Sequence, residues 1–202
     1  MQMGNKREAA RDDMRTRLID AAETRIAAKG LAGLKAREVT SDAGVALGGL
    51  YNAFADLDDL VLQVNSRSLQ RLGDTLRATC VPGLGPKDAL AALAQAYVSF
   101  ALQQFQLWSA LFNHRLPDGV EPPDWYRADH AVLIEQIIGP LAMLRPDLDA
   151  AMILQRAKTV FAAVHGVVQL SLRGRFVGVA RQDLGGEVAA LVAAMTRGLE
   201  VP

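Results

Sequence analysis

Few residues of this 202-residue chain have the types and spacing that catalysis or metal binding needs. The histidines lie too far apart for metal-ligand spacing: His114, His130 and His165. The densest acidic cluster, residues 56–59, is better explained by the start of a helix, where carboxylates interact favourably with the helix dipole. The sequence also lacks a glycine-rich phosphate loop and the HExxH, CxxC and GxSxG patterns. We therefore expect no enzyme, no bound metal and no cofactor, and a binding function gains weight.

The stretch 43–54, AGVALGGLYNAF, predicts a helix-turn-helix. Gly44 stands between two short apolar patterns and permits the left-handed backbone that a tight inter-helix turn needs. The helix after this turn would then lie on DNA, yet it carries two glycines and no positive charge. Net charge does not decide the matter, because 22 basic residues balance 22 acidic ones.

Composition and periodicity favour an all-α fold, with half of the residues hydrophobic and only 5% aromatic. Leu18, Ala22 and Ile26 recur at helical spacing within 11–29, after a frayed leader over 1–9. Gly30 ends this helix, short helices follow over 35–42 and up to residue 52, and Phe54 acts as an apolar plug. Three such helices make a small domain that needs support from a neighbour.

The rest of the chain predicts longer helices. Asp56 and Asp59 have the spacing of a capping box at the start of the first of them. The expected helices cover 56–79, 87–104, 105–114, 124–144, 148–173 and 184–200, with breaks at 82–86 and 116–123. The last two are so apolar that we expect them to form a homodimer interface, although completing an intrachain bundle is the alternative.

Residues 14–64 resemble the TetR family of bacterial transcriptional regulators. The segment 18–22, LIDAA, is similar to the family's first-helix core, and 39–54 matches its helix-turn-helix pattern without a gap. The resemblance implies a DNA-binding domain over 10–60 and a ligand-binding and dimerisation domain over 61–202. Ala46, Gly49 and Leu57 stand where the family often has serine, threonine and lysine, so three phosphate contacts are missing.

The resemblance also implies the residues that meet DNA. Arg37 falls where some members read a base and could bond guanine, and Tyr51 could reach a phosphate. The candidate DNA-binding residues are Arg17, Arg37, Leu47, Gly48, Gly49, Tyr51 and Asn52. Each has a structural alternative: Tyr51 as a core aromatic, Asn52 as a helix-end cap, and Arg37 as an ion-pair partner of Glu38 or Asp42.

The downstream part resembles, more diffusely, the family's subgroup with a C-terminal domain named for Trp, His and Gly. The run 161–166, FAAVHG, has Phe161 in place of the tryptophan. Scarce aromatic residues gather here as a sensor pocket would require, with core packing as the alternative. The candidate ligand-binding residues are Tyr97, Phe105, Trp108, Phe112, Phe161 and His165.

These observations predict a ligand-responsive transcriptional regulator, a repressor that a small apolar ligand releases. As a homodimer it would bind a near-palindromic double-stranded operator. The alternatives are an all-helical small-molecule-binding protein or enzyme without DNA function, and a helical protein-interaction module. We expect a cytoplasmic protein without membrane segments, because residues 159–172 are too short to span a bilayer and the charged N-terminus is no signal peptide. The single cysteine, Cys80, excludes an intramolecular disulfide.

Overall fold

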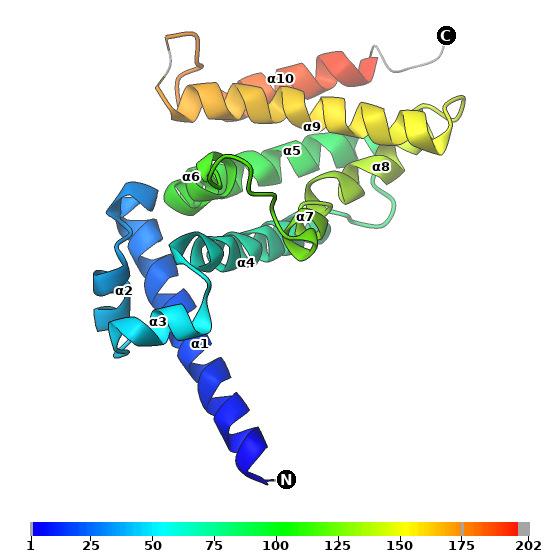
Figure 1. The fold of residues 1–202 in the computed structure, drawn as a ribbon. Helices are drawn as coiled ribbons and strands as arrows, with labels where there is room; N and C mark the ends of the chain where they lie inside the picture. The colour runs from blue at the N-terminus through cyan, green and yellow to red at the C-terminus, as the bar shows by residue number, and fades with distance from the viewer. Residues whose placement is uncertain (1, 175, 198–202) are drawn as a thin grey trace. The chain divides into compact units, whose positions relative to one another are not determined.

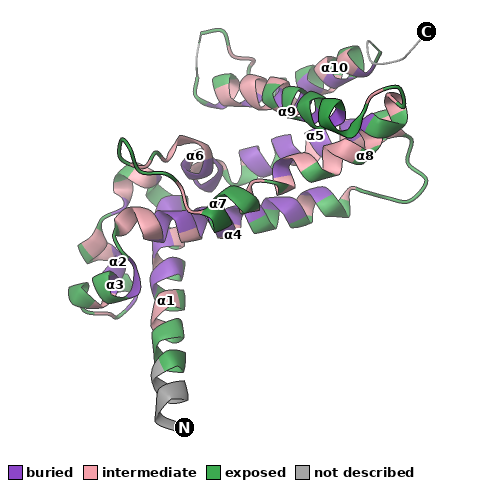
Figure 2. Ribbon diagram, turned by 45° about the vertical axis from the view of Figure 1, so that its right-hand side comes forward, coloured by how far each residue is buried: buried purple, intermediate pink, exposed green. Residues whose placement is uncertain are grey.

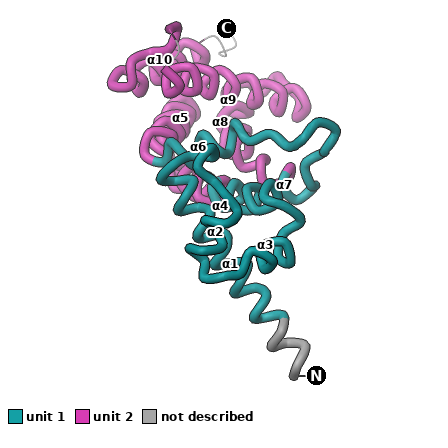
Figure 3. Tube along the Cα trace, turned by 60° about the vertical axis from the view of Figure 1, so that its left-hand side comes forward, with its two compact units in different colours: residues 1–68, 104–126 teal, residues 69–103, 127–202 magenta. Residues whose placement is uncertain are grey.

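The computed structural model describes residues 2–174 and 176–197, with side chains from residue 8 onward, and all secondary structure in these ranges is helical (Figure 1). The expected all-α fold is thus confirmed. The chain divides into two compact units, residues 1–68 with 104–126 and residues 69–103 with 127–202 (Figure 3). Helix α4 (Leu57–Ala78) gives its first half to the first unit and its second half to the second.

The first unit holds the short N-terminal helices and one later helix. They are α1 (Gln2–Lys29), the 3-10 turn η1 (Leu31–Gly33), α2 (Ala36–Asp42), α3 (Leu47–Ala53) and α6 (Phe105–Asn113). Helix α1 begins at Gln2, so the expectation of a frayed leader is wrong for residues 2–9. Six of these eight residues are glutamine, methionine, lysine, arginine, glutamate and alanine, all of which favour helix.

The core of the first unit forms around α1. Leu18, Ala22 and Ile26 have no exposed surface, which confirms the predicted periodicity. They pack with buried residues of α2, α3 and the start of α4, and with Leu107 and Ala110 of α6. The buried stripe along the inner part of α1 is visible in Figure 2. This packing holds the small three-helix domain in place.

The turn between α2 and α3 has the predicted geometry. Gly44 has φ +62°, a conformation that side chains other than glycine rarely adopt. The backbone N–H of Val45 then donates to the carbonyl of Thr40 at 2.9 Å, which closes the turn before α3 begins. Phe54 is 2% exposed at the end of α3, as expected for a plug.

Two aspartates cap the start of α4. The Asp56 carboxylate accepts from the backbone N–H of Asp59 at 2.7 Å, and the Asp59 carboxylate accepts from the backbone N–H of Ala55 at 3.1 Å. The bond from Asp59 N–H to Asp56 confirms the predicted cap and satisfies a donor that a helix start leaves unbonded, whereas the Asp59 carboxylate bonds Ala55 in place of the Asp56 N–H of a full capping box.

The second unit is a bundle in which α5 (Pro86–Gln103) packs against three helices. They are α8 (Val132–Leu144), α9 (Ala150–Leu172) and α10 (Leu184–Arg197). The Asp149 carboxylate caps α9 by accepting from the backbone N–H of Met152 at 2.8 Å. None of the helices in the described part of the chain combines the length and the hydropathy that crossing a bilayer requires.

The expected single helix over 124–144 is wrong in one respect, because the structure has α7 (Asp124–Asp129) and α8 separated at His130 and Ala131. The backbone N–H groups of both residues bond carbonyls three residues earlier, at 3.3 and 3.0 Å. Such bonds form turns, so the helix direction changes here although the apolar pattern continues.

Candidate nucleic-acid interface and apolar cavity

Helix α3 presents the predicted residues on its outer face. Leu50 and Ala53 are buried, whereas Leu47 is 39% and Tyr51 54% exposed. Asn52 is exposed as well. The exposure of Tyr51 argues against its alternative role as a core aromatic. The outer face therefore offers a hydroxyl, an amide and an apolar side chain, which are groups that can meet phosphates and base edges.

The two glycines of α3 differ in their surroundings. A methyl group added at Gly48 would meet no atom within 4 Å. One added at Gly49 would lie 2.5 Å from Cγ1 of Val45 and 3.3 Å from the sulfur of Met14. Gly49 is therefore required for packing of α3, while Gly48 lies open on the outer face. Sequence reasoning gave both residues the same role.

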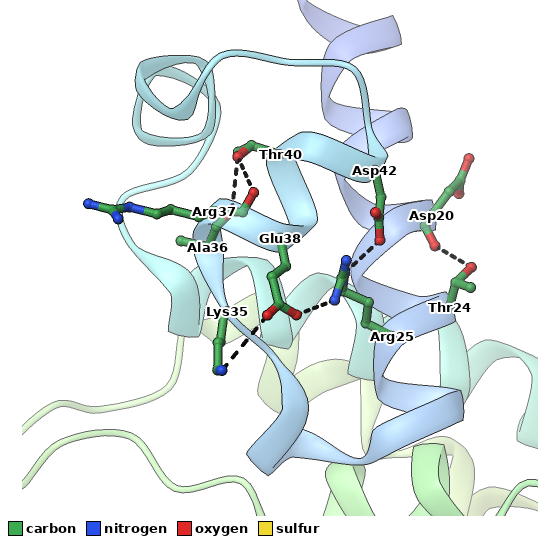
Figure 4. Close-up of polar contacts among 9 residues, drawn as sticks. All are labelled: Asp20, Thr24, Arg25, Lys35, Ala36, Arg37, Glu38, Thr40 and Asp42. Carbon is green, nitrogen blue, oxygen red and sulfur yellow. Dashed lines mark hydrogen bonds and ion pairs between the residues drawn. The ribbon is translucent and has the colours of Figure 1, made fainter.

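Arg37 lies exposed on α2, beside a hollow that Lys35, Leu47 and Tyr51 also line. Its alternative partners, Glu38 and Asp42, are both bound by Arg25 of α1, with 2.5 Å from Arg25 Nε to Asp42 Oδ2. Figure 4 shows the Arg37 side chain extending away from this cluster. Arg37 is thus held on the same side as α3 without an ion pair to either carboxylate.

Arg25 was missed as a functional residue by sequence reasoning. The hydrogen bond to Asp42 and the nearby Glu38 carboxylate raise its pKa above the usual value, so it remains charged. By bonding both acidic residues of α2, Arg25 fixes that helix against α1. The sequence offers little indication of this role, because the partners of Arg25 lie 13 and 17 residues away, on a different helix.

Two arginines of α1 bond the C-terminal ends of α2 and α3. Arg17 Nη1 donates to the carbonyl of Ala43 at 3.0 Å, at the C-terminal end of α2. The guanidinium of Arg15 lies 4.4 Å from the ring centre of Phe54 and bonds the carbonyl of Ala53, at the end of α3. Cations at helix C-termini are favourable. Arg17 is half exposed, so its predicted contact with DNA stays a prediction beside this positioning role.

Leu57 packs against the core of the first unit. Its side chain stands at the position where the family resemblance implies a lysine that meets a phosphate. Packing therefore explains why a leucine stands at this position. We expect few phosphate contacts from the start of α4.

The predicted ligand-binding residues divide into two groups. In the first unit, Trp108 is fully buried, with its ring centre 6.3 Å from that of Phe105 and 5.4 Å from that of Phe112. None of these three lines the cavity of the second unit. Tyr97, Phe161 and His165 belong to the second unit. The structure therefore places two of the six candidates, Tyr97 and Phe161, at that cavity, with His165 in contact with both.

The second unit contains a small apolar cavity of about 40 Å³. Tyr97 and Phe161 line it, and their rings meet edge to face at 5.6 Å. The other walls are aliphatic side chains of α4, α5, α8, α9 and α10, with Gln136 as a polar exception. Gln136, which sequence reasoning missed, accepts a hydrogen bond from the thiol of Cys80 at 3.3 Å.

His165 lies behind the cavity wall. Its Nδ1 is 2.6 Å from the Tyr97 hydroxyl, and its ring stacks on Phe161 at 5.6 Å. Burial lowers the pKa of His165, and a hydrogen bond with Gln169 opposes this only in part. A neutral imidazole can accept a hydrogen bond from the Tyr97 hydroxyl at Nδ1, so His165 orients Tyr97. In the described part of the chain, no three His, Cys, Asp or Glu residues gather as a metal site.

Comparisons with known proteins bear on the family and the fold. Residues 90–198 match a family model described as "Tetracyclin repressor-like, C-terminal domain". A protein of unknown function from Rhodococcus sp. RHA1 has 25% identity and a TM-score of 0.72, covering 93% of this chain and 96% of its own. No curated protein matches.

Two further solved structures share the fold. RolR, in complex with resorcinol, is 20% identical with a TM-score of 0.66 and covers 95% of both chains. The transcriptional regulator FadR from Bacillus subtilis, in complex with stearoyl-CoA, is 15% identical with a TM-score of 0.60. It covers 91% of this chain and 96% of its own.

Proposed function

The chain belongs to the TetR family of transcriptional regulators, and from this we propose that it is a ligand-responsive repressor that binds operator DNA as a homodimer. Its site of action would be the cytoplasm, where DNA is accessible. A small apolar effector would release it from the operator. The observation that carries the proposal is the outward arrangement of Arg37 and the exposed face of α3.

Each exposed group has a matching partner on DNA. The Arg37 guanidinium can bond guanine with two hydrogen bonds, and Leu47 can contact a thymine methyl group. The Tyr51 hydroxyl and the Asn52 amide can bond phosphates, and Gly48 lets the backbone come close. Arg25 supports this role because it removes Glu38 and Asp42 from competition for Arg37.

The homodimer would form through α9 and α10. One face of α9 leaves Met152 49% and Leu170 43% exposed in the single chain, with Ala163 and Gly166 between them. A methyl group added at Gly166 or at Gly186 of α10 would meet nothing within 4 Å. Small and apolar outer faces allow two helix pairs to pack closely. Two-fold symmetry would place the recognition helices about 34 Å apart, so the operator should be a near-palindrome.

The effector would bind at the cavity lined by Tyr97 and Phe161. RolR with resorcinol and FadR with stearoyl-CoA have this fold, which supports a small-molecule site in this chain. A cavity of about 40 Å³ is far below the size of a typical ligand pocket, so the effector must widen it. Release of DNA then requires that the effector bind the widened state better than the DNA-bound state.

The proposal is tested by selecting genomic DNA fragments on the immobilised full chain and measuring their affinity in solution. We expect a near-palindromic fragment to be enriched. The double variant Tyr51→Ala/Asn52→Ala should lose it, whereas Arg115→Ala, a change at an exposed arginine just after α6, should retain it.

The same measurements separate the alternatives. If no fragment is enriched and the chain still binds small molecules, it is a helical binding protein or enzyme without DNA function. Turnover of a bound molecule would favour the enzyme, and we expect none.

A further inference from the structure

An open groove of about 550 Å³ follows α8 and α9 of the second unit. Its floor is apolar, formed by Ile134, Ile138 and Leu154. On α9, Leu154, Lys158 and Phe161 succeed one another at four and three residues, so they share one helix face. A groove with an apolar floor and charged residues along it suits a ligand with two chemically different ends.

The charge along this groove is positive on balance. Arg127 and Lys158 line it together with one acidic residue, Glu135, while His130 lies near the end of α7. Lys158 is exposed, and it forms no ion pair with another residue in the described part of the chain. Its methylene groups can cover the apolar floor while its ammonium group faces an anion.

Groove and cavity share two wall residues, Leu133 and Phe161. The half-buried ring of Phe161 borders both spaces, and it meets the Tyr97 ring edge to face and stacks on the His165 ring. A ligand that enters from the groove must therefore displace this ring to reach the cavity. The displacement would also disturb the contact between Phe161 and the bonded pair of Tyr97 and His165.

We propose that groove and cavity form one site for an amphiphilic carboxylate, whose apolar tail passes Phe161 into the cavity and whose carboxylate bonds Lys158 and Arg127. The inference rests on the proposed function in one respect, because it makes this amphiphile the effector and so adds a charged end to the apolar effector proposed above. Glu135 opposes the carboxylate and weakens binding. The apolar walls beyond Phe161 exclude a second charged end, so a dicarboxylate does not fit.

The probes are decanoic acid, methyl decanoate and decylamine, titrated calorimetrically into the full chain below their aggregation concentrations. We expect the carboxylate to bind at least tenfold more tightly than the ester and the amine. Each added methylene between hexanoate and decanoate should tighten binding about fourfold. Equal affinity for decanoate and its ester overturns the proposal, and so does the absence of binding.

Matched variants locate the headgroup. Lys158→Gln should weaken decanoate about tenfold and leave methyl decanoate unchanged, and Glu135→Gln should tighten decanoate severalfold. The control Lys87→Gln alters an exposed lysine at the start of α5 and should change neither affinity. If Lys158→Gln and Lys87→Gln behave alike, the carboxylate does not bind in this groove.

Phe161→Ala should accelerate decanoate association severalfold, because it removes the ring between groove and cavity. An unchanged association rate would contradict the role of Phe161. None of these measurements uses DNA, so the site can stand if the chain proves not to bind DNA. Conversely, a chain that binds an operator but no amphiphile refutes this inference alone. One further measurement, of operator affinity with and without decanoate, tests whether the amphiphile is the effector. If decanoate binds at the groove and operator affinity does not fall, the claim that it is the effector is overturned.

Discussion

The two compact units use their candidate residues in opposite ways. In the first unit, Arg37, Leu47 and Tyr51 point outward from helices that ion pairs and backbone bonds hold in place. In the second, Tyr97 and Phe161 enclose a space that is smaller than any typical ligand. The first unit suits a partner larger than itself, and the second suits one that it can surround. Substitutions of these outward residues should therefore weaken binding and leave stability unchanged. Substitutions of the cavity residues should change both binding and stability.

The two groups of aromatic residues differ in another way, because those of the first unit form a core. Trp108 and its neighbours pack ring against ring with no exposed surface at the indole. Phe161 is half-buried and borders both an interior cavity and an open groove. Aromatic content alone does not separate a core from a pocket, whereas adjacent empty volume does.

The largest expected effect tests this distinction. Trp108→Ala should lower the free energy of unfolding by about 3–5 kcal/mol, because it leaves a large cavity in a packed core. Phe161→Ala should cost less, since its ring already borders empty space. Chemical denaturation of both variants measures the difference. If Trp108→Ala is as stable as Phe161→Ala and loses only its ligand response, the indole belongs to a pocket.

An intermediate effect is expected at Arg37. Arg37→Ala should weaken specific DNA binding by about 1–3 kcal/mol and relax the preference at one base pair per half-site. The free energy of unfolding should stay within about 0.5 kcal/mol of the original, because the side chain is exposed. Arg25→Ala should lower both stability and affinity, since it frees Glu38 and Asp42. An equal loss of specific and non-specific binding in Arg37→Ala would make this residue a phosphate contact.

The two glycines of α3 should give opposite results of smaller size. Gly48→Ala should stabilise the chain by up to about 1 kcal/mol, because alanine favours helix and its methyl group meets nothing. Gly49→Ala should destabilise it, because Val45 stands 2.5 Å from the new methyl group. Thermal melts compare the two. Weaker DNA affinity in the more stable Gly48→Ala protein would indicate close backbone approach to DNA.

The smallest effect concerns pH and the second unit. The pKa of His165 is lowered in the folded chain, so the unfolded chain takes up a proton more readily. Stability is then full above the ordinary histidine pKa and falls as the pH drops through about 6.5. Protonation at Nδ1 would also remove the acceptor for the Tyr97 hydroxyl. Unfolding measured between pH 8 and pH 5.5 should show a shallower decline in His165→Gln, and parallel curves would contradict this assignment.

Local signals in the sequence predicted much of the fold. Periodic apolar residues located α1, glycine at 44 located the turn, and two aspartates located the start of α4. The separation of α7 from α8 was not predictable, because the apolar pattern runs on while the backbone turns.

The site was predictable only where neighbours along the chain are neighbours in space. Helix α3 meets this condition, and its exposed residues follow from its own periodicity. The aromatic residues over 97–112 do not, because α5 ends before Gln104 and the chain then enters the other unit. Arg25 and Gln136 depend on partners more than a dozen residues away, for which helix periodicity carries no information.

The double ion pair of Arg25 has a consequence for evolution. Because Arg25 pairs with both carboxylates of α2, the side chain at position 37 is not needed for the stability of the fold. A duplicated gene could therefore exchange that one residue and acquire a new operator while keeping its scaffold. Divergence of regulatory targets would then begin at position 37, and position 25 would remain under purifying selection.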